Sequence, residues 1–139
     1  MKPIEGEAPM YQNLAILRMA GQMAGNAALR QSAVAQNVAN ADTPGYKAVD
    51  APSFAETYQA DQALTLRTTR AGHLGAAGGQ DTPRLAPRSD PGTESPNGNT
   101  VSLEGEMVRA AELRHQHDMA LAIYKTAQQV LRTSLGRQG

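Results

Sequence analysis

Apolar and small residues fill the first third of the chain almost without interruption, and this pattern predicts one long helix. Residues 10–41 hold only two charged side chains, Arg18 and Arg30. A first heptad row consists of Met10, Leu14, Leu17, Gly21, Ala24, Ala28, Gln31, Ala35 and Val38. A second row beside it consists of Ile16, Ala20, Met23, Ala27 and Val34. Because the combined face is too broad for a two-stranded coil, we expect a helix that is central in a bundle or covered by other subunits. Gly21 and Gly25 fit either tolerated glycines or the close approach of a neighbouring helix.

The last third of the chain repeats the heptad pattern and predicts a second long helix over residues 103–135. Ser102 is the expected N-cap, and Glu104 and Glu106 fall in the first turn, where we expect them to be solvated and favoured by the helix dipole. Gly136 is a plausible stop. The main row is Leu103, Met107, Ala110, Arg114, His117, Leu121, Tyr124, Gln128, Leu131 and Leu135, and a second row is Met119, Ile123, Ala127 and Val130.

Between the helices, residues 37–47 predict a helix end followed by a tight turn. Asn40 tolerates the left-handed conformation and can end the helix. Pro44 and Gly45 suit the two central positions of a type II turn, where Pro presets φ and Gly supplies a positive φ. Tyr46 can then cover the helix end with its ring while its hydroxyl stays in water.

The rest of the middle segment has a mixed pattern. Phe54 and Tyr58 are spaced for one helical turn. Residues 64–69 alternate and are rich in threonine, which predicts a short strand or extended arm. Residues 72–99 have the glycine and proline content of a linker, and Asn97–Gly98 is a strong turn dipeptide. The expected divisions are a disordered N-terminal segment (1–9), the first helix (10–41), the turn and arm (42–74), a flexible loop (75–99) and the C-terminal helix segment (100–139).

Two helices of nearly equal length predict a mainly α fold in which they pair antiparallel, as a coiled-coil-like hairpin, with the irregular segment at the far end. Within the pair we expect Leu14, Leu17, Leu121 and Leu131 to pack. Two helices cannot bury both broad faces, so the remaining apolar surface predicts assembly. The further residues expected in packing or assembly are Met23, Val38, Leu103, Met107, Tyr124 and Leu135.

Composition narrows the possible functions. The 139 residues carry 13 basic and 13 acidic side chains, and this zero net charge argues against a nucleic-acid-binding protein. The absence of cysteine excludes disulfides and thiolate metal sites. Residues 1–9 lack the apolar run of a secretory signal peptide, and we find no stretch near the roughly 20 apolar residues that a membrane-spanning helix needs.

The sequence offers no active site. His115 and His117 are two residues apart on the predicted helix and point to different faces, so they cannot share a metal ion. His73 lies in the middle segment. No nucleophile elbow, phosphate-binding loop or dinucleotide fingerprint occurs. We therefore expect neither an enzyme nor a cofactor.

One motif carries a specific resemblance. The pattern Asn-x-Ala-Asn-x-x-Thr-Pro-Gly-Tyr-Lys is matched by Asn37, Ala39, Asn40, Thr43, Pro44, Gly45, Tyr46 and Lys47. In this it resembles the bacterial flagellar rod and hook protein family. Residues 67–74 and 97–107 are similar to stretches of the proximal-rod members, whereas residues 75–96 have no match. His117 stands where those members usually have an aromatic residue.

The resemblance implies a structural subunit of the proximal rod of the flagellar basal body. Such a subunit would be exported by the flagellar type III apparatus without cleavage of a signal peptide, polymerise helically in the periplasm and transmit torque. Implied partners are copies of itself, the other rod proteins, the membrane ring and the adaptor that joins rod to ring. Asn40, Pro44, Gly45 and Tyr46 would set the chain reversal. The alternative from the helical pattern alone is a soluble helical-hairpin binding module, such as an export adaptor or chaperone.

Overall fold

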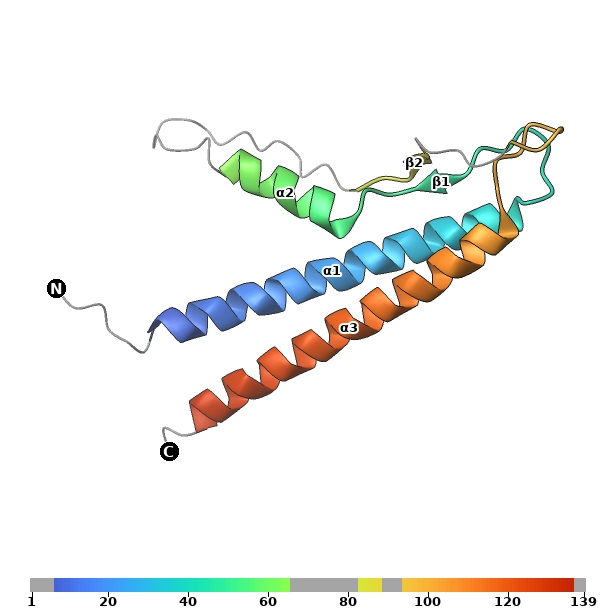
Figure 1. Ribbon diagram of the computed structural model, residues 1–139. Helices are drawn as coiled ribbons and strands as arrows, with labels where there is room; N and C mark the ends of the chain where they lie inside the picture. The colour runs from blue at the N-terminus through green and yellow to red at the C-terminus, as the bar shows by residue number, and fades with distance from the viewer. Residues whose placement is uncertain (1–6, 66–82, 89–93, 137–139) are drawn as a thin grey trace.

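The computed structural model describes residues 7–65, 83–88 and 94–136. Two long helices, α1 (Glu7–Ala39) and α3 (Leu103–Gly136), run antiparallel as a hairpin, which confirms the predicted mainly α fold (Figure 1). The start of α1 and the end of α3 form its open end. The end of α1 and the start of α3 form its closed end. None of the described helices has an apolar run long enough to cross a membrane.

The chain between the two helices returns alongside α1 (Figure 1). Strand β1 (Val49–Asp50) pairs antiparallel with β2 (Ala86–Pro87), and α2 (Phe54–Thr65) lies between them in sequence. A capping box starts α2, because the backbone N–H of Ser53 donates to Glu56 and the N–H of Glu56 donates back to the Ser53 hydroxyl. The rings of Phe54 and Tyr58 lie 5.7 Å apart, as their spacing predicted.

The two ends of α1 differ from the prediction. The helix includes residues 7–9, which were expected to be disordered; residues 1–6 lie outside the described part. Pro9 is tolerated because the first-turn N–H groups have no helical partner. The C-terminal end comes two residues earlier than expected. Asn40 does not end it in the left-handed conformation, because among the described residues only glycines have a positive φ. Instead the Asn40 N–H donates to the carbonyls of Gln36 and Asn37, which tightens the last turn.

Two predictions for the middle segment are wrong where the structure tests them. Leu64 and Thr65 belong to α2 rather than to a strand, since the preceding alanines and glutamines favour a helix; residues 66–69 lie outside the described part. In the predicted flexible loop, residues 83–88 contain β2 and residues 94–99 form an ordered turn. The described parts of this loop are therefore held against the hairpin rather than free of it.

The row of α3 that packs against α1 is not the predicted main row, which contains the large apolar residues of this helix. Its buried residues are Glu106, Leu113, Ala120 and Ala127, which are one heptad apart and one position before the row Met107, Arg114, Leu121 and Gln128. On α1 the second predicted row is the buried one, with Ala20, Ala27 and Val34. Small alanines allow close approach, so the larger side chains are left on the flanks.

The residues predicted to pack or assemble fall into two groups. Leu17, Met23 and Leu131 are half-buried. Leu14 and Leu121 are 49% and 40% exposed, so they lie outside the buried rows, and their packing within the pair stays a prediction. The others are also exposed, and their role in assembly stays a prediction; they are Val38, Leu103, Met107, Tyr124 and Leu135.

Candidate functional site

Asn37 is the centre of a buried polar cluster at the closed end. Its side chain has no exposed surface. The amide nitrogen donates to the Val49 carbonyl (2.9 Å) and to Glu106 Oε2 (3.2 Å). The amide oxygen accepts from the Val49 N–H (2.8 Å) and the Tyr46 hydroxyl (3.2 Å). All four hydrogen-bonding positions of the amide are used, so this side chain joins α1, the turn, β1 and α3.

Glu106 supplies the charge of this cluster and was not predicted to do so. Its residue surface is 1% exposed, although a solvated position in the first turn of α3 was expected. One carboxylate oxygen accepts a hydrogen bond from Asn37, and the other accepts one from the guanidinium of Arg88. Arg88 is the residue that directly follows β2. Arg88 is itself held by its N–H, which donates to the Ala48 carbonyl (2.8 Å). A buried carboxylate needs such a partner, so burial of Glu106 depends on the chain around β2.

Asn99 is a second buried asparagine, and it holds the chain that follows α1 against the loop that precedes α3. It is 2% exposed, and its amide nitrogen lies 2.8–2.9 Å from the carbonyl oxygens of Asn40, Ala41 and Thr43. These groups include carbonyls that a helix end leaves without a helical partner. The Asn99 amide oxygen accepts from the Val101 N–H, and this bond orients the start of α3.

The type II turn at Pro44–Gly45 is confirmed. The Tyr46 N–H donates to the Thr43 carbonyl, and Gly45 has φ +73°. Gly98 also has a positive φ, as its turn dipeptide predicted, and a Cβ added there would lie 3.4 Å from the Gly45 Cα. The Gly45 N–H donates to the Asn97 carbonyl, so the two turns are bonded to each other.

The other turn residues have separate roles. The Tyr46 hydroxyl is not in water as expected, since it donates to Asn37, and burial together with the charge of Glu106 raises the pKa of Tyr46. The Thr43 hydroxyl donates to the Asn40 side chain at the surface. Lys47 is exposed and donates to Glu94 and to the Gly98 carbonyl. Such an exposed pair contributes little stability, so Lys47 is peripheral to the cluster.

Asp50 connects the two long helices from β1. Its carboxylate accepts two hydrogen bonds from Arg30 of α1, at 3.1 and 2.9 Å, and one from Arg109 of α3 at 3.4 Å. Burial alone would raise the pKa of Asp50, but the Arg30 hydrogen bond, the Ala51 N–H and the two guanidinium charges together lower it. The hydrogen bond to Asp50 also raises the pKa of Arg30. The carboxylate therefore stays ionised and clamps both helices.

The polar residues of α1 at the closed end share one face. Asn26, Arg30 and Asn37 all bind the returning chain, and Asn26 does so by donating to the Pro52 carbonyl (2.9 Å). Sequence reasoning included Asn37 for its motif but gave no role to Asn26, Arg30, Asp50 or Arg88. Asn99 and Glu106 lie within residues 97–107, which resemble the proximal-rod members. That resemblance was the only sequence signal that pointed to them. Asp50 and Arg88 have no local signal, because their partners are distant in sequence.

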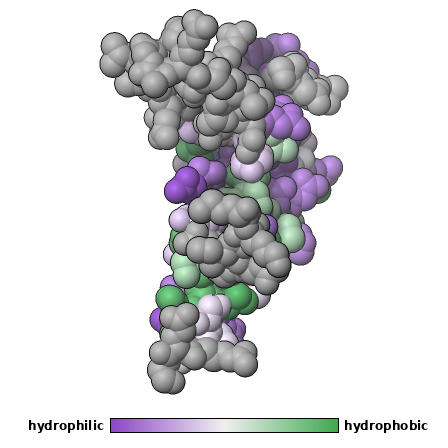
Figure 2. All heavy atoms as spheres, turned by 90° about the vertical axis from the view of Figure 1, so that its left-hand side faces the viewer, coloured by the Kyte–Doolittle hydropathy of each residue, from purple (hydrophilic) through white to green (hydrophobic). Residues whose placement is uncertain are grey.

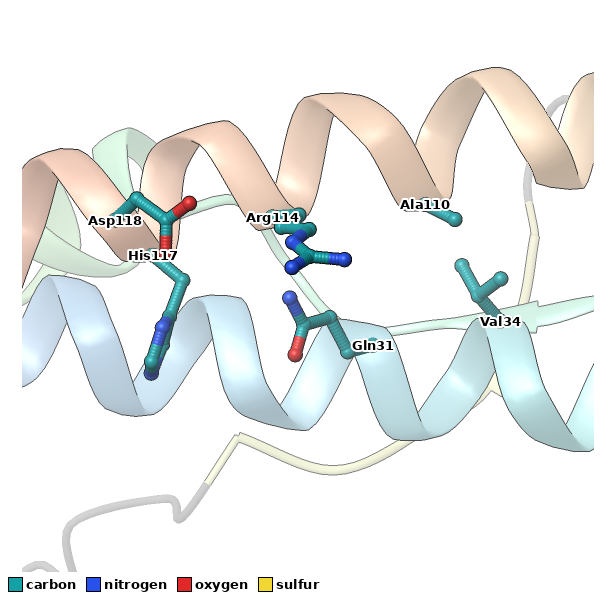
Figure 3. Close-up of a pocket in the computed structure, with 6 residues that line it drawn as sticks. All are labelled: Gln31, Val34, Ala110, Arg114, His117 and Asp118. Atoms are coloured by element: carbon teal, nitrogen blue, oxygen red, sulfur yellow. The ribbon is translucent and has the colours of Figure 1, made fainter.

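A shallow groove of ≈ 410 Å³ lies further along the hairpin, between α1 and α3. It is lined by Gln31, Val34, Ala110, Arg114, His117 and Asp118. In Figure 3 Arg114 and Gln31 face one another, and His117 extends from α3 toward α1. The described residues contain no group of histidines and carboxylates that could hold a metal ion. The polar side chains of the closed end are bonded to one another, so the arrangement is suited to holding segments together.

The comparisons with known proteins agree with this arrangement. Residues 19–47, which include the end of α1 and the turn, match the family described as flagella basal body rod protein. Over 94 residues the chain is 45% identical to the flagellar basal body rod protein FlgB of Cereibacter sphaeroides, covering 66% of this chain and 73% of that protein.

Two further relatives extend the match. The chain is 36% identical over 105 residues to FlgB of Escherichia coli, covering 68% of this chain and 74% of that protein. It is 28% identical over 131 residues to FlgB of Agrobacterium fabrum, covering 91% of this chain and 96% of that protein. With the motif residues now seen to meet at the closed end, the chain belongs to the FlgB family of flagellar basal body rod proteins.

Proposed function

We propose that this chain is a structural subunit of the flagellar basal body rod, which polymerises helically in the periplasm, links the membrane ring to the distal rod and transmits torque. The observation that carries the proposal is the amount of apolar surface left on both long helices. On α1 it includes Met10, Tyr11, Leu14, Ile16 and Met19, and on α3 it includes Met107, Val108, Met119, Leu121, Val130 and Leu135, all more than a third exposed. Figure 2, which faces the open end, shows hydrophobic residues at the surface. Monomeric proteins rarely leave such extended apolar surface in water.

The closed end suits a part that bears load. Asn37, Asp50, Asn99 and Glu106 tie four segments of the chain together through buried hydrogen bonds. The Asn37 amide uses all of its hydrogen-bonding positions, although Arg88 Nε is buried without a partner. Satisfied buried hydrogen bonds make a structure rigid and specify a single arrangement. The subunit then combines a rigid closed end with flanks that are free to contact neighbours, which is what torque transmission through a polymer requires.

The partners that we propose for the subunit are copies of itself, other rod proteins, the membrane-ring protein, the rod-to-ring adaptor and the flagellar type III export apparatus. Support for the rod partners comes from the relatives, whose names place them in the basal body rod. Export without cleavage is proposed for the N-terminal segment, residues 1–9. Replacing residues 2–9 should block export, and the protein in isolated basal bodies should keep its N-terminal sequence by intact-mass measurement.

Deletion of the gene, followed by complementation, tests the function. We expect a non-motile strain without rods, restored by the wild-type chain, and we expect that chain in purified basal bodies. Circular dichroism of the purified chain should show helicity that rises as subunits assemble. A swimming deletion strain would refute the proposal. A stable cytoplasmic dimer absent from basal bodies would instead favour the adaptor or chaperone function.

A further inference from the structure

The groove between α1 and α3 continues toward the open end as an apolar face (Figure 3). Heptad steps from the groove-lining residues identify its members, because residues seven apart lie on the same side of a helix. With Leu14, which is one turn after Met10, the apolar members are Met10, Leu14 and Leu17 on α1 and Leu121, Tyr124 and Leu135 on α3. Leu17 is half-buried, and the other five are 40% to 64% exposed. We call this surface the groove face.

The charged side chains beside the groove face are basic at the open end. Two stretches form the open half of the hairpin, residues 10–22 and 119–136. The charged residues in these stretches are Arg18, Lys125 and Arg132, and all three are exposed. Lys125 and Arg132 follow the groove-lining Asp118 at heptad steps, and Arg18 is one turn after Leu14. None of the three takes part in an ion pair among the described residues. The groove face therefore combines an apolar centre with unpaired cations along its edges.

The returning chain lies on another side of the hairpin. Asn26 and Arg30 of α1 bind it through Pro52 and Asp50. At 3.6 residues per turn these two side chains are about 120° and 160° round the helix from Leu14. A flat surface can therefore approach the groove face without meeting α2 or the β1–β2 pair.

Apolar residues are also exposed on the other side of α3, but without neighbouring charge. Ile123 is two residues after Leu121 and therefore points away from the groove face. Ile123 and its heptad neighbour Val130 are 39% and 45% exposed. The basic residues of the open half accompany the groove face instead, so charge distinguishes the two sides.

An apolar face edged by basic side chains suits an anionic lipid surface. Helices that lie on a membrane bury such a face at the boundary of the acyl chains, while long basic side chains extend to the headgroups. Anionic headgroups attract each basic residue that lies near the surface. Tyr11 and Tyr124 are 67% and 40% exposed, and tyrosine favours the boundary between water and lipid because its ring is apolar and its hydroxyl polar.

We propose that the groove face binds the surface of an anionic phospholipid bilayer while the chain is unassembled. The paired helices lie in the plane of the interface, with Leu14, Leu121 and Leu135 at the acyl boundary. Arg18, Lys125 and Arg132 contact the lipid phosphates. This binding goes beyond the proposed rod function and does not depend on it, because it concerns the single chain.

Flotation of the purified chain with lipid vesicles tests the proposal. Vesicles of phosphatidylcholine alone are compared with vesicles of equal parts phosphatidylcholine and phosphatidylglycerol. We expect binding to the anionic vesicles and its loss at high salt, because salt screens charges that lie near a surface. Absence of binding to the anionic vesicles, or equal binding to both kinds of vesicle at every salt concentration, would overturn the proposal.

Two substitutions that remove one charge each test the position of the cations. Arg132→Gln should weaken binding to the anionic vesicles about fivefold, because a basic residue at the lipid surface is lost. The matched control is Arg84→Gln, which removes an exposed cation from the returning chain just before β2. It should change binding by less than about twofold. Equal losses in the two variants would show attraction to net charge alone and would contradict the assigned face.

Tryptophan fluorescence identifies the side that enters the bilayer, because the chain contains no tryptophan. Leu121 and Ile123 match in exposure, at 40% and 39%, and lie on opposite sides of α3. Anionic vesicles should shift the emission of Leu121→Trp to shorter wavelength and leave that of Ile123→Trp nearly unchanged. A shift in Ile123→Trp without one in Leu121→Trp would assign the wrong face and overturn the proposal.

The same measurements separate lipid from a second copy of the chain. If the emission of Leu121→Trp shifts with protein concentration and not with vesicles, a second copy covers the face and the proposal is wrong. Flotation and fluorescence use different substitutions, so a variant that loses the wild-type helix content leaves the other measurement to decide. Failure of vesicle binding would leave the rod function intact, since that function is tested in basal bodies.

Discussion

The two ends of the hairpin are held together in different ways. At the closed end, buried asparagines and charges join α1, α3, the turn and the β1–β2 pair. At the open end, Ala20, Ala120 and Ala127 are the buried residues among those described, and large apolar side chains lie on the surface. Directional hydrogen bonds specify one geometry, whereas alanine contacts are weak and tolerate adjustment. In the monomer, the polar side chains of the closed end are hydrogen-bonded and buried, whereas the open end leaves large apolar side chains exposed.

Replacement of Asn37 should cause the largest loss of stability at the closed end. Asn37→Leu removes at once the hydrogen-bond partner of the Val49 N–H and carbonyl, of the Tyr46 hydroxyl and of Glu106 Oε2, while Glu106 keeps its bond from Arg88. Each unsatisfied buried group costs about 1–3 kcal/mol, with incomplete additivity, so we expect a loss of about 4 kcal/mol in the free energy of unfolding. Urea denaturation measures it. A loss below about 1 kcal/mol would mean that the closed end is not held by this cluster.

Removal of the Arg88 charge should come next. Arg88→Met leaves Glu106 buried without its cation, and breaking one partner of a buried ion pair costs about 3–5 kcal/mol. The double variant Arg88→Met with Glu106→Leu removes both charges and should recover much of the stability, since an apolar replacement of a buried pair is often neutral. If the double variant is less stable than Arg88→Met, the pair is not the reason for the loss.

Matched leucine truncations compare the two ends directly. Leu113 is 3% exposed near the closed end, whereas Leu131 is half-buried near the open end. We expect Leu113→Ala to cost about 2–3 kcal/mol and Leu131→Ala about 1 kcal/mol in the isolated chain, because a buried truncation leaves a cavity. Equal losses in urea unfolding would show that the open end is packed as firmly as the closed end.

Gly45→Val tests the backbone of the turn. Nothing lies within 4 Å of an added Cβ at Gly45, so space is available, but φ is +73°. A β-branched residue is strained in that conformation, and we expect a cost of about 1–3 kcal/mol together with impaired assembly. The matched control Gly25→Ala, where φ is helical, should stabilise the isolated helix slightly. Wild-type stability and motility for Gly45→Val would refute the role assigned to the turn.

The smallest expected effect is the pH dependence from Asp50. Its folded-state pKa is lowered, so its contribution to stability is complete above the ordinary aspartate value of about 3.9 and is lost as the pH falls through the lowered folded-state value. Unfolding measured between neutral and acid pH should show this loss. Asp50→Asn should flatten that part of the profile, and an unchanged profile would mean that Asp50 does not titrate with folding.

Local sequence signals determined the two long helices and the turn that follows the first of them. Long heptad runs predicted both long helices, and Pro44–Gly45 predicted the turn, because backbone preferences act within a few neighbouring residues. The tertiary structure alone decided which row of α3 is buried. Met107 and Leu121 made their row look like the seam, yet Leu113 and the small Ala120 and Ala127 let the helices approach more closely. Both rows repeat every seven residues, so spacing could not distinguish them.

The same limit applies to the polar residues. Glu106 has the sequence context of a solvated first-turn residue, and it becomes buried because Asn37, 69 residues earlier, and Arg88 provide hydrogen bonds to it. Whether a carboxylate is solvated or buried depends on partners that only the folded chain brings together. The sequence therefore determined where the helices and the turn form, and the three-dimensional contacts determined which side chains join them.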